Sequence, residues 1–181
     1  MARWNNQVSF PFLCLLISGG HTQLLQANGV GSYSLLGTTL DDSVGEVIDK
    51  AARMLDIPYN SETNECAASK LVDMANYKSS DLEMIHFAAP TSSYLAKSLD
   101  FSFSGLKTAL KDFLAKEKFI SNTDTIYGQN MKAKAARGFL YACSQHLGDK
   151  LVNAIKLFGD NVNDKVVISG GVARNEFLFS Q

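Results

Sequence analysis

The sequence predicts a mixed α/β domain. Three short apolar runs at 10–17, 21–27 and 33–38 are separated by glycine-containing turns, which is the pattern of an antiparallel meander of strands. Later stretches carry apolar residues at helical spacing, and one more short apolar run, at 166–168, follows the longest of them. Strands, then helices, then a strand again indicate a sheet covered by helices.

The first predicted helix directly follows the three strands. Its N-terminal cap is expected at Asp42 or Ser43 together with Glu46. Its apolar face consists of Val44, Val47, Ile48, Ala51, Ala52 and Leu55. After a polar connector at 60–65, a second and weaker helix is marked by Ala68, Leu71, Val72 and Ala75.

The second half of the chain is expected to be mainly helical. Residues 79–100 show no clear period and contain a proline, which predicts a loop. A patterned helix with Leu106, Ala109, Leu110, Phe113 and Leu114 follows. A long helix is expected from about 130 to 158, with Gly159 as its stop. The strand at 166–168 then leads into a helix that begins at Val172.

This order of elements is that of a ribonuclease-H-like domain, the half-unit of the actin-like architecture. We expect one partial domain over residues 1–181, with its core in 10–56 and 101–181 and an inserted helical or loop segment at 57–100. The first strand and the last helix lie so close to the ends of the sequence that we expect an incomplete lobe.

Composition excludes several classes of protein. With 46% hydrophobic and 19% charged residues, the chain is typical of an ordinary globular domain, and its longest apolar run is too short for a membrane span. We expect no membrane partner. Cys14, Cys66 and Cys143 are odd in number and widely spaced, which predicts reduced core thiols.

Charge is unevenly distributed along the chain. Acidic residues outnumber basic ones from 41 to 100, whereas basic residues dominate from 105 to 137. The basic stretch would suit phosphates, but a solvated lysine face is the commoner explanation. Its members are Lys107, Lys111, Lys116, Lys118, Lys132, Lys134 and Arg137.

The chain contains Ile-Ser-Gly-Gly twice, at 17–20 and 168–171, each time after an apolar run. Glycine-rich turns at the ends of buried strands can present N–H donors to an anion. Two of them favour a nucleotide held at both ends, whereas either one alone would be a tight turn.

Four groups of motifs, in this order, resemble the tRNA N6-adenosine threonylcarbamoyltransferase family, also called the glycoprotease family. They are Phe10-Pro-Phe-Leu with Leu16-Ile-Ser-Gly-Gly-His-Thr-Gln23, Leu36-Gly with Leu40-Asp-Asp and Gly45-Glu-x-x-Asp-Lys50, Asp100-Phe-Ser-Phe-Ser-Gly-Leu-Lys-Thr108, and Ser169-Gly-Gly-Val-Ala-Arg-Asn175. The Ser-Gly-Gly-His-Thr form is similar to the bacterial and mitochondrial branch.

The resemblance implies transfer of a threonylcarbamoyl group from threonylcarbamoyl-adenylate to the N6 amine of the adenosine 3′ of the anticodon, in tRNAs that read codons beginning with A. It implies actin-like lobes with the adenylate between them. The implied partners are that adenylate, tRNA, and a second copy or other subunits of the modification machinery. The implied location is the mitochondrion for a eukaryotic source and the cytoplasm otherwise.

The resemblance also assigns site residues. The phosphate side of the adenylate would lie on the loop formed by Leu16, Ile17, Ser18, Gly19 and Gly20. Asp49 would accept hydrogen bonds from the ribose hydroxyls, and Asn175 would contact the nucleoside end at the opening of a helix. No catalytic residue is assigned, because attack by an amine needs positioning and charge stabilisation rather than an enzyme nucleophile.

Each assignment has a structural alternative. Asp49 could pair with Arg53 one turn later, and Asn175 could cap a helix. Lys107 would either reach a phosphate or lie exposed on its helix. For His21, we favour a half-buried strand residue.

Two departures from the family pattern stand out. Glu62 occupies the position of a glycine that contacts substrate, and its carboxylate is expected to obstruct or repel the adenylate. The family's divalent metal ion, iron or zinc, is held by a His-x-x-x-His pair and an aspartate that have no counterpart in these 181 residues. We therefore expect no metal site and no turnover from this chain alone.

Two other classes remain open. An actin-like ATPase or sugar kinase would use the same turns for ATP. A non-catalytic interaction module of the same fold would bind a partner subunit without binding an adenylate.

Overall fold

The computed structural model describes residues 8–58, 66–77, 83–88, 93–116, 125–163 and 165–179. Strands β1 (Phe12–Ile17), β2 (Thr22–Gly29), β3 (Ser32–Thr38) and β4 (Val166–Ser169) form one sheet in the order β3-β2-β1-β4. The first three strands pair antiparallel, and β4 pairs parallel with β1. The predicted strands and the ribonuclease-H-like α/β class are thus confirmed.

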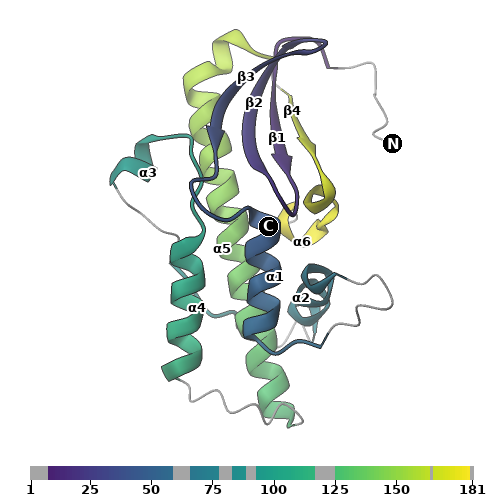
Figure 1. Cartoon of the computed structure of the whole chain (residues 1–181), viewed down its shortest axis with the longest axis vertical. Coiled ribbons are helices and arrows are strands. Elements are labelled where there is room, and N and C mark those ends of the chain that lie inside the picture. Colours follow the sequence, from purple (N-terminus) through teal and green to yellow (C-terminus); the bar gives the residue numbers. More distant parts are fainter. Residues whose placement is uncertain are drawn as a thin grey trace.

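Helices cover the sheet and extend beyond it. The long helix α5 (Ile126–Phe158) runs along one face of the sheet and continues below it, where α1 (Val44–Met54), α2 (Ala67–Asn76) and α4 (Ser104–Lys116) pack around it (Figure 1). The helix begins four residues before the predicted start, at a cap in which Thr125 accepts from the Gly128 N–H. Gly159 caps its other end with a right-handed φ of −54°.

The pairing of β1 with β4 brings the two glycine turns together. Leu16 lies opposite Ser169 in the parallel register, so the carboxyl ends of both strands meet at one edge of the sheet. Gly170 has a φ of 105°, and a Cβ there would lie 2.0 Å from the carbonyl oxygen of Ile17. Only glycine permits this approach.

Several local predictions need correction. The expected loop at 79–100 contains a short helix, α3 (Ser93–Lys97). The segment after Val172 is not one helix: a 3₁₀ turn, η3 (Gly171–Arg174), precedes α6 (Glu176–Phe179). Another 3₁₀ turn, η2 (Gly159–Asn161), follows α5. The predicted connector at 60–65 lies outside the described residues.

The three cysteines are free, but they are not all core thiols. Cys143 is buried and Cys14 is half-buried, and burial raises the pKa of both thiols. Cys66 is exposed because it precedes the first turn of α2 at the rim of a pocket. In the described part of the chain, no helix combines the length and the apolar character that crossing a membrane requires.

The basic stretch is not simply a solvated face. Lys132 is 3% exposed and donates to the carbonyl oxygen of Asp56 at 2.6 Å, beyond the end of α1. Arg137 donates from two guanidinium nitrogens to the Ala75 carbonyl oxygen near the end of α2. These cations bind carbonyl groups at helix ends, where the backbone lacks partners. Lys118 lies outside the described residues.

The predicted cap of α1 is confirmed at Ser43, and its loss should be measurable. Ser43 Oγ accepts from the Glu46 N–H at 3.2 Å and donates to the Gly19 carbonyl oxygen at 2.6 Å. We expect Ser43→Ala to lower the free energy of unfolding by about 2 kcal/mol, because a cap and a tertiary hydrogen bond are both lost. Urea unfolding measures this, and Ser32→Ala at an exposed site is the control. Equal losses would contradict the prediction.

Candidate functional site

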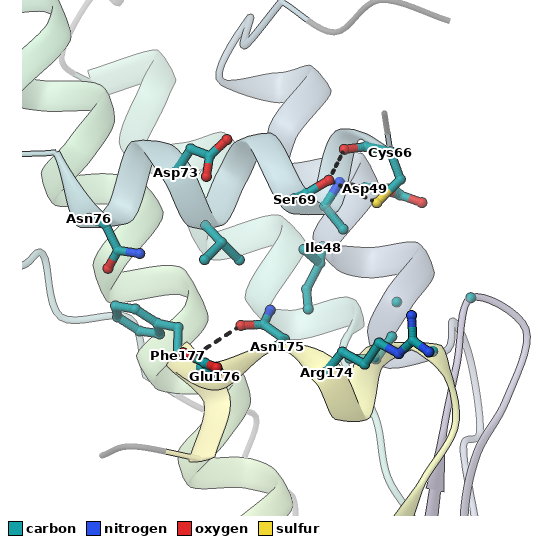
Figure 2. Close-up of a pocket in the computed structure, with 16 residues that line it drawn as sticks. Ile48, Asp49, Cys66, Ser69, Asp73, Asn76, Arg174, Asn175, Glu176 and Phe177 are labelled. Atoms are coloured by element: carbon teal, nitrogen blue, oxygen red, sulfur yellow. Dashed lines mark hydrogen bonds between the residues drawn. The ribbon is translucent and has the colours of Figure 1, made fainter. Parts of the chain in front are cut away.

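A pocket of about 590 Å³ lies beside the joined glycine turns (Figure 2). Its walls come from the β1–β2 turn, the first half of α1, one side of α2, and the segment that runs from η3 into α6. Two helices and two turns that are distant in the sequence therefore enclose a single space. Pockets at the carboxyl edge of a parallel strand pair are the usual binding sites of α/β folds.

Three of the predicted site residues line this pocket. They are Gly19, Asp49 and Asn175, which come from three separate segments of the chain. Leu16 and Ile17 belong to β1 instead, and Ile17 is fully buried. Ser18 and Gly20 lie in the adjoining turn, outside the set of residues that line the pocket. The binding roles of all seven stay predictions.

The β1–β2 turn is closed by its own hydrogen bonds. Ser18 Oγ accepts from the N–H groups of Gly20 at 3.2 Å and His21 at 3.0 Å. The Ser18 N–H in turn donates to the His21 carbonyl oxygen at 2.8 Å. Three of the backbone donors near the predicted phosphate site are thus already engaged. His21 is exposed and precedes β2, so the expectation of a half-buried strand residue is wrong.

Asp49 serves a role that neither sequence interpretation included. Its Oδ1 accepts from the Ala68 N–H at 2.8 Å, which ties α1 to the first turn of α2. A carboxylate has two oxygens and several acceptor positions, so the second oxygen remains able to accept from a ligand. Asp49 can therefore hold the pocket's two helical walls together and also contact what lies between them.

Asn175 lies between η3 and α6 and does act as a cap. Its Oδ1 accepts from the Phe177 N–H at 3.1 Å, as the dashed line in Figure 2 shows. The side-chain nitrogen of the same amide remains a donor, which suits an acceptor atom on a nucleoside. The capping alternative and the contact alternative are compatible, because they use different atoms.

The start of α1 is fitted closely against the turn. A Cβ at Gly45 would lie 2.5 Å from the Ser18 carbonyl oxygen and 2.8 Å from Gly19 Cα. Thr22 Oγ1 accepts from the Val44 N–H at 2.8 Å, which fixes the same junction from the strand side. The pocket thus includes the first turn of α1, where the helix dipole is positive.

Sequence reasoning missed the α2 wall and the charged residues of the last segment. The residues missed from the pocket lining include Cys66, Ser69, Asp73 and Asn76 at α2 and Arg174 and Glu176 in the last segment. The weak helix at α2 was recognised from its apolar face, but nothing in its sequence indicates that the other face borders a cavity. For Arg174, the available signal was its position next to Asn175 in the second glycine motif.

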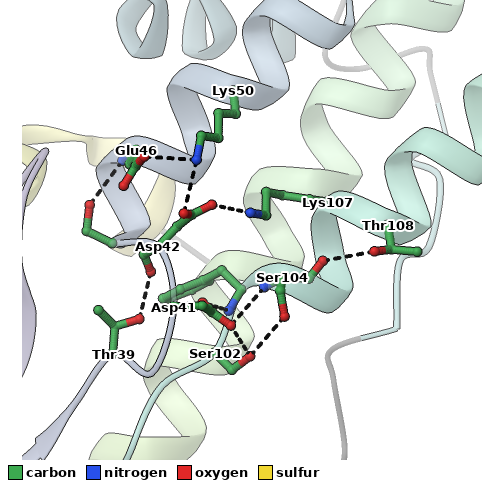
Figure 3. A network of polar contacts seen from close by, with 11 residues as sticks. Thr39, Asp41, Asp42, Glu46, Lys50, Ser102, Ser104, Lys107 and Thr108 are labelled. Atoms are coloured by element: carbon green, nitrogen blue, oxygen red, sulfur yellow. Dashed lines mark hydrogen bonds and ion pairs between the residues drawn. The ribbon is translucent and has the colours of Figure 1, made fainter.

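A second polar cluster lies outside the pocket, between α1 and α4 (Figure 3). Asp42 forms ion pairs with Lys50 at 3.0 Å and with Lys107. The hydrogen bond from Lys107 is the main reason why the pKa of Asp42 is lowered. Lys107 is therefore a partly buried ion-pair partner, which is neither of the two roles considered for it.

Asp41 organises the same cluster. Its carboxylate accepts from the Phe103 N–H at 2.8 Å and the Ser104 N–H at 3.3 Å, as well as from Ser102 Oγ. Burial opposes ionisation of this carboxyl, but these hydrogen bonds outweigh it and lower its pKa. The cluster holds the start of α4 against the start of α1 and is a structural feature.

The described residues do not fit the metal ion that the family pattern implies. Across the ranges that the structure covers, no group of three or more His, Cys, Asp or Glu side chains is placed to hold a metal. We therefore derive no chemical step through a metal. Glu62, which was expected to obstruct the adenylate, lies outside the described residues.

Residues 1–181 match the family model of tRNA N6-adenosine threonylcarbamoyltransferase. Proteins of that name include one from Rickettsia bellii (strain OSU 85-389), which is 36% identical over 180 residues. That alignment covers 98% of this chain and 48% of the Rickettsia protein. The one from Herminiimonas arsenicoxydans is 39% identical over 169 residues, with 93% of this chain and 44% of that protein aligned. The chain thus spans about half the length of these relatives.

Solved structures show a more distant likeness. Component A of (R)-2-hydroxyglutaryl-CoA dehydratase from Acidaminococcus fermentans aligns with a TM-score of 0.49 and 13% identity, over 94% of this chain and 51% of that one. The activator of 2-hydroxyisocaproyl-CoA dehydratase from Clostridium difficile aligns with a TM-score of 0.48 and 12% identity, over 94% and 49%.

Proposed function

This chain belongs to the tRNA N6-adenosine threonylcarbamoyltransferase family, and on that premise we propose that its pocket binds the adenylate of threonylcarbamoyl-adenylate. One observation carries the proposal. Gly19, Asp49 and Asn175 come from three separate segments of the chain, and all three line one cavity of about 590 Å³. That volume lies within the range of small-molecule sites.

The chemistry of the lining supports an adenylate. Apolar side chains such as Ile48, Val72 and Phe177 suit the flat base, and a carboxylate at Asp49 suits the ribose hydroxyls. The pocket reaches the β1–β2 turn and the first turn of α1, where an anionic phosphate would meet the positive end of a helix.

The proposed reaction is the transfer of the threonylcarbamoyl group to tRNA. The N6 amine of the adenosine 3′ of the anticodon forms a bond to the carbamoyl carbonyl carbon, in tRNAs that read codons beginning with A. The bond between that carbon and the phosphate oxygen breaks, AMP leaves with the electron pair, and the amine proton passes to water. The residues of this chain would contribute binding and orientation of the adenylate rather than a nucleophile.

The remaining expectations follow from the same premise. The nucleic-acid partner is tRNA, and a second copy or other subunits of the modification machinery would join it. The place of action is the mitochondrion for a eukaryotic source and the cytoplasm otherwise. The metal ion, iron or zinc, would be held by residues other than those that the structure describes.

Calorimetric titration of the chain with AMP tests the proposal directly. AMP carries the base, ribose and phosphate that the pocket would hold, so measurable saturable binding is expected. Failure to bind AMP would contradict the proposal and favour the interaction-module alternative. ATP hydrolysis that needs neither tRNA nor threonine would favour the ATPase alternative instead.

A variant of Asp49 tests the ribose contact. Asp49→Asn keeps an oxygen for the Ala68 N–H but replaces the second acceptor by a donor. We expect AMP affinity to fall about tenfold or more, as for loss of a hydrogen bond to a charged group. The same substitution should lower the affinity for 2′-deoxy-AMP by a smaller factor, because this ligand lacks the 2′-hydroxyl and so already lacks part of the ribose contact with Asp49.

The matched control is Asp112→Asn, at an exposed position of α4 outside the pocket, which should leave both affinities unchanged. Equal losses for AMP and its deoxy analogue would argue against a ribose contact. Thermal unfolding of Asp49→Asn should stay close to that of the unmodified chain, since the tie to α2 is retained.

A further inference from the structure

The pocket has an uneven distribution of charge. Among the described residues that line it, Arg174 is the only basic one, whereas Asp49, Asp73 and Glu176 are acidic. Figure 2 shows Arg174 at the opposite end of the pocket from Asp73 and Phe177. Within the described chain, no hydrogen bond or ion pair engages the exposed Arg174 side chain. A single available cation therefore marks one end of the cavity.

The backbone turn at this end cannot neutralise an anion by itself. The N–H groups of Ser18, Gly20 and His21 all donate within the turn. In the first turn of α1, the Val44 N–H is bound by Thr22 and the Glu46 N–H by Ser43. A phosphate that entered here would meet a turn whose backbone donors are partly engaged already, and among the described residues that line the pocket Arg174 supplies the one full positive charge.

There is open space where such a phosphate would lie. A Cβ at Gly19 or at Gly171 would have no heavy atom within 4 Å apart from its immediate neighbours. Both glycines line the pocket, as does Gly45 at the start of α1. The two glycine turns therefore border an accessible space that the Arg174 side chain adjoins, and the α1 dipole adds to its positive potential.

We propose, resting on the function proposed above, that the guanidinium of Arg174 binds the phosphate of the adenylate and makes this site select 5′-phosphorylated nucleosides. The planar guanidinium can donate two parallel hydrogen bonds to two phosphate oxygens. In the transfer reaction, the bond between the carbonyl carbon and the phosphate oxygen breaks, and the phosphate of AMP gains negative charge. The contact with Arg174 therefore strengthens as the leaving group departs.

Comparison of AMP with adenosine tests this role. We expect Arg174→Gln to weaken AMP binding about tenfold or more, as for loss of a charged hydrogen bond, and to leave adenosine affinity within about twofold. Arg174→Lys should restore part of the AMP affinity, since it keeps the charge without the planar fork. The control is Arg53→Gln, which removes an exposed arginine from α1 outside the pocket and should change neither affinity.

The outcomes separate this inference from the proposed function. If the unmodified chain binds AMP but Arg174→Gln binds it equally well, or loses AMP and adenosine affinity equally, the phosphate role of Arg174 is wrong while the adenylate pocket stands. If the unmodified chain binds neither AMP nor adenosine, the proposed function fails, and the role of Arg174 fails with it.

Discussion

Replacement of Gly170 by alanine is expected to lower the free energy of unfolding by about 3 kcal/mol and to impair AMP binding. The native φ of 105° is strained for any residue with a side chain, and the added Cβ would lie 2.0 Å from the Ile17 carbonyl oxygen. Each effect costs about 1–3 kcal/mol. Urea unfolding measures the stability change, and calorimetry under folding conditions measures the affinity for AMP.

The binding defect has a geometric cause. Gly170 lies directly against the end of β1, and η3 with Arg174 follows it at once. Relief of the clash must move the second glycine turn away from the first, which separates Asn175 and Arg174 from Gly19. AMP affinity should therefore fall even in the fraction of the protein that is folded.

The neighbouring glycine provides the control. A Cβ at Gly171 would meet no atom within 4 Å, so Gly171→Ala should change the free energy of unfolding by less than about 0.5 kcal/mol. If Gly170→Ala is no more destabilising than Gly171→Ala, the close approach to Ile17 does not constrain the fold. The two variants differ by one position, so effects of composition cancel.

Features with a local cause were predictable from the sequence. The six apolar residues assigned to one face of α1 are all fully buried, and the cap lies at Ser43. Helical period and cap chemistry both act within a few residues of one another, which is why a single sequence reveals them. The same holds for the three-strand meander, whose turns contain the glycines that end each strand.

Features that depend on packing between segments were not predictable. Lys132 is buried because a carbonyl group beyond α1 needs a donor, and that carbonyl is 76 positions away in the sequence. Cys66 is exposed because it precedes the first turn of α2 at the rim of the pocket. No periodicity within either helix carries this information, since the partner belongs to another element.

The candidate site divides in the same way. The two glycine turns and Asp49 were recognisable from their motifs. Gly19, Asp49 and Asn175 line one pocket, while their binding roles stay predictions. The hydrogen bonds from the Gly20 and His21 N–H groups to Ser18 could not be recognised from the sequence, because they depend on how one turn closes. The second role of Asp49, toward Ala68, required knowledge of where α2 packs.

Acidification from pH 7 to pH 5 is expected to cost about 2 kcal/mol of stability through His146 alone. The side chain is 4% exposed, its Nε2 accepts from the Ser102 N–H at 3.2 Å, and the rings of Phe101 and Phe103 lie edge-on at 6.0 and 5.2 Å. Burial is the main cause that lowers the pKa of His146 to about 4. The charge of Lys150 adds to it, and Asp149 and Asp41 oppose it.

The sign of the effect follows from proton uptake. In the unfolded chain, His146 binds a proton near its ordinary pKa of 6.5, whereas the folded protein keeps it neutral down to about pH 4. Between these values the unfolded state holds more protons, so the free energy of unfolding falls as the pH falls through this window. Above the window, the contribution of the neutral His146 to stability is fully present. Urea unfolding at pH 7, 6 and 5 measures the slope.

A variant that keeps the hydrogen bond but cannot titrate isolates His146 from the other ionisable groups. His146→Gln retains an acceptor for the Ser102 N–H. At pH 7 it should be less stable than the unmodified chain, because the new side chain packs less well against Phe103. Between pH 7 and pH 5 it should lose little further stability, because glutamine does not titrate. His86→Gln removes an exposed histidine and should keep the full dependence on pH. If His146→Gln shows the same drop between pH 7 and pH 5 as the unmodified chain, the neutral buried imidazole is not its origin.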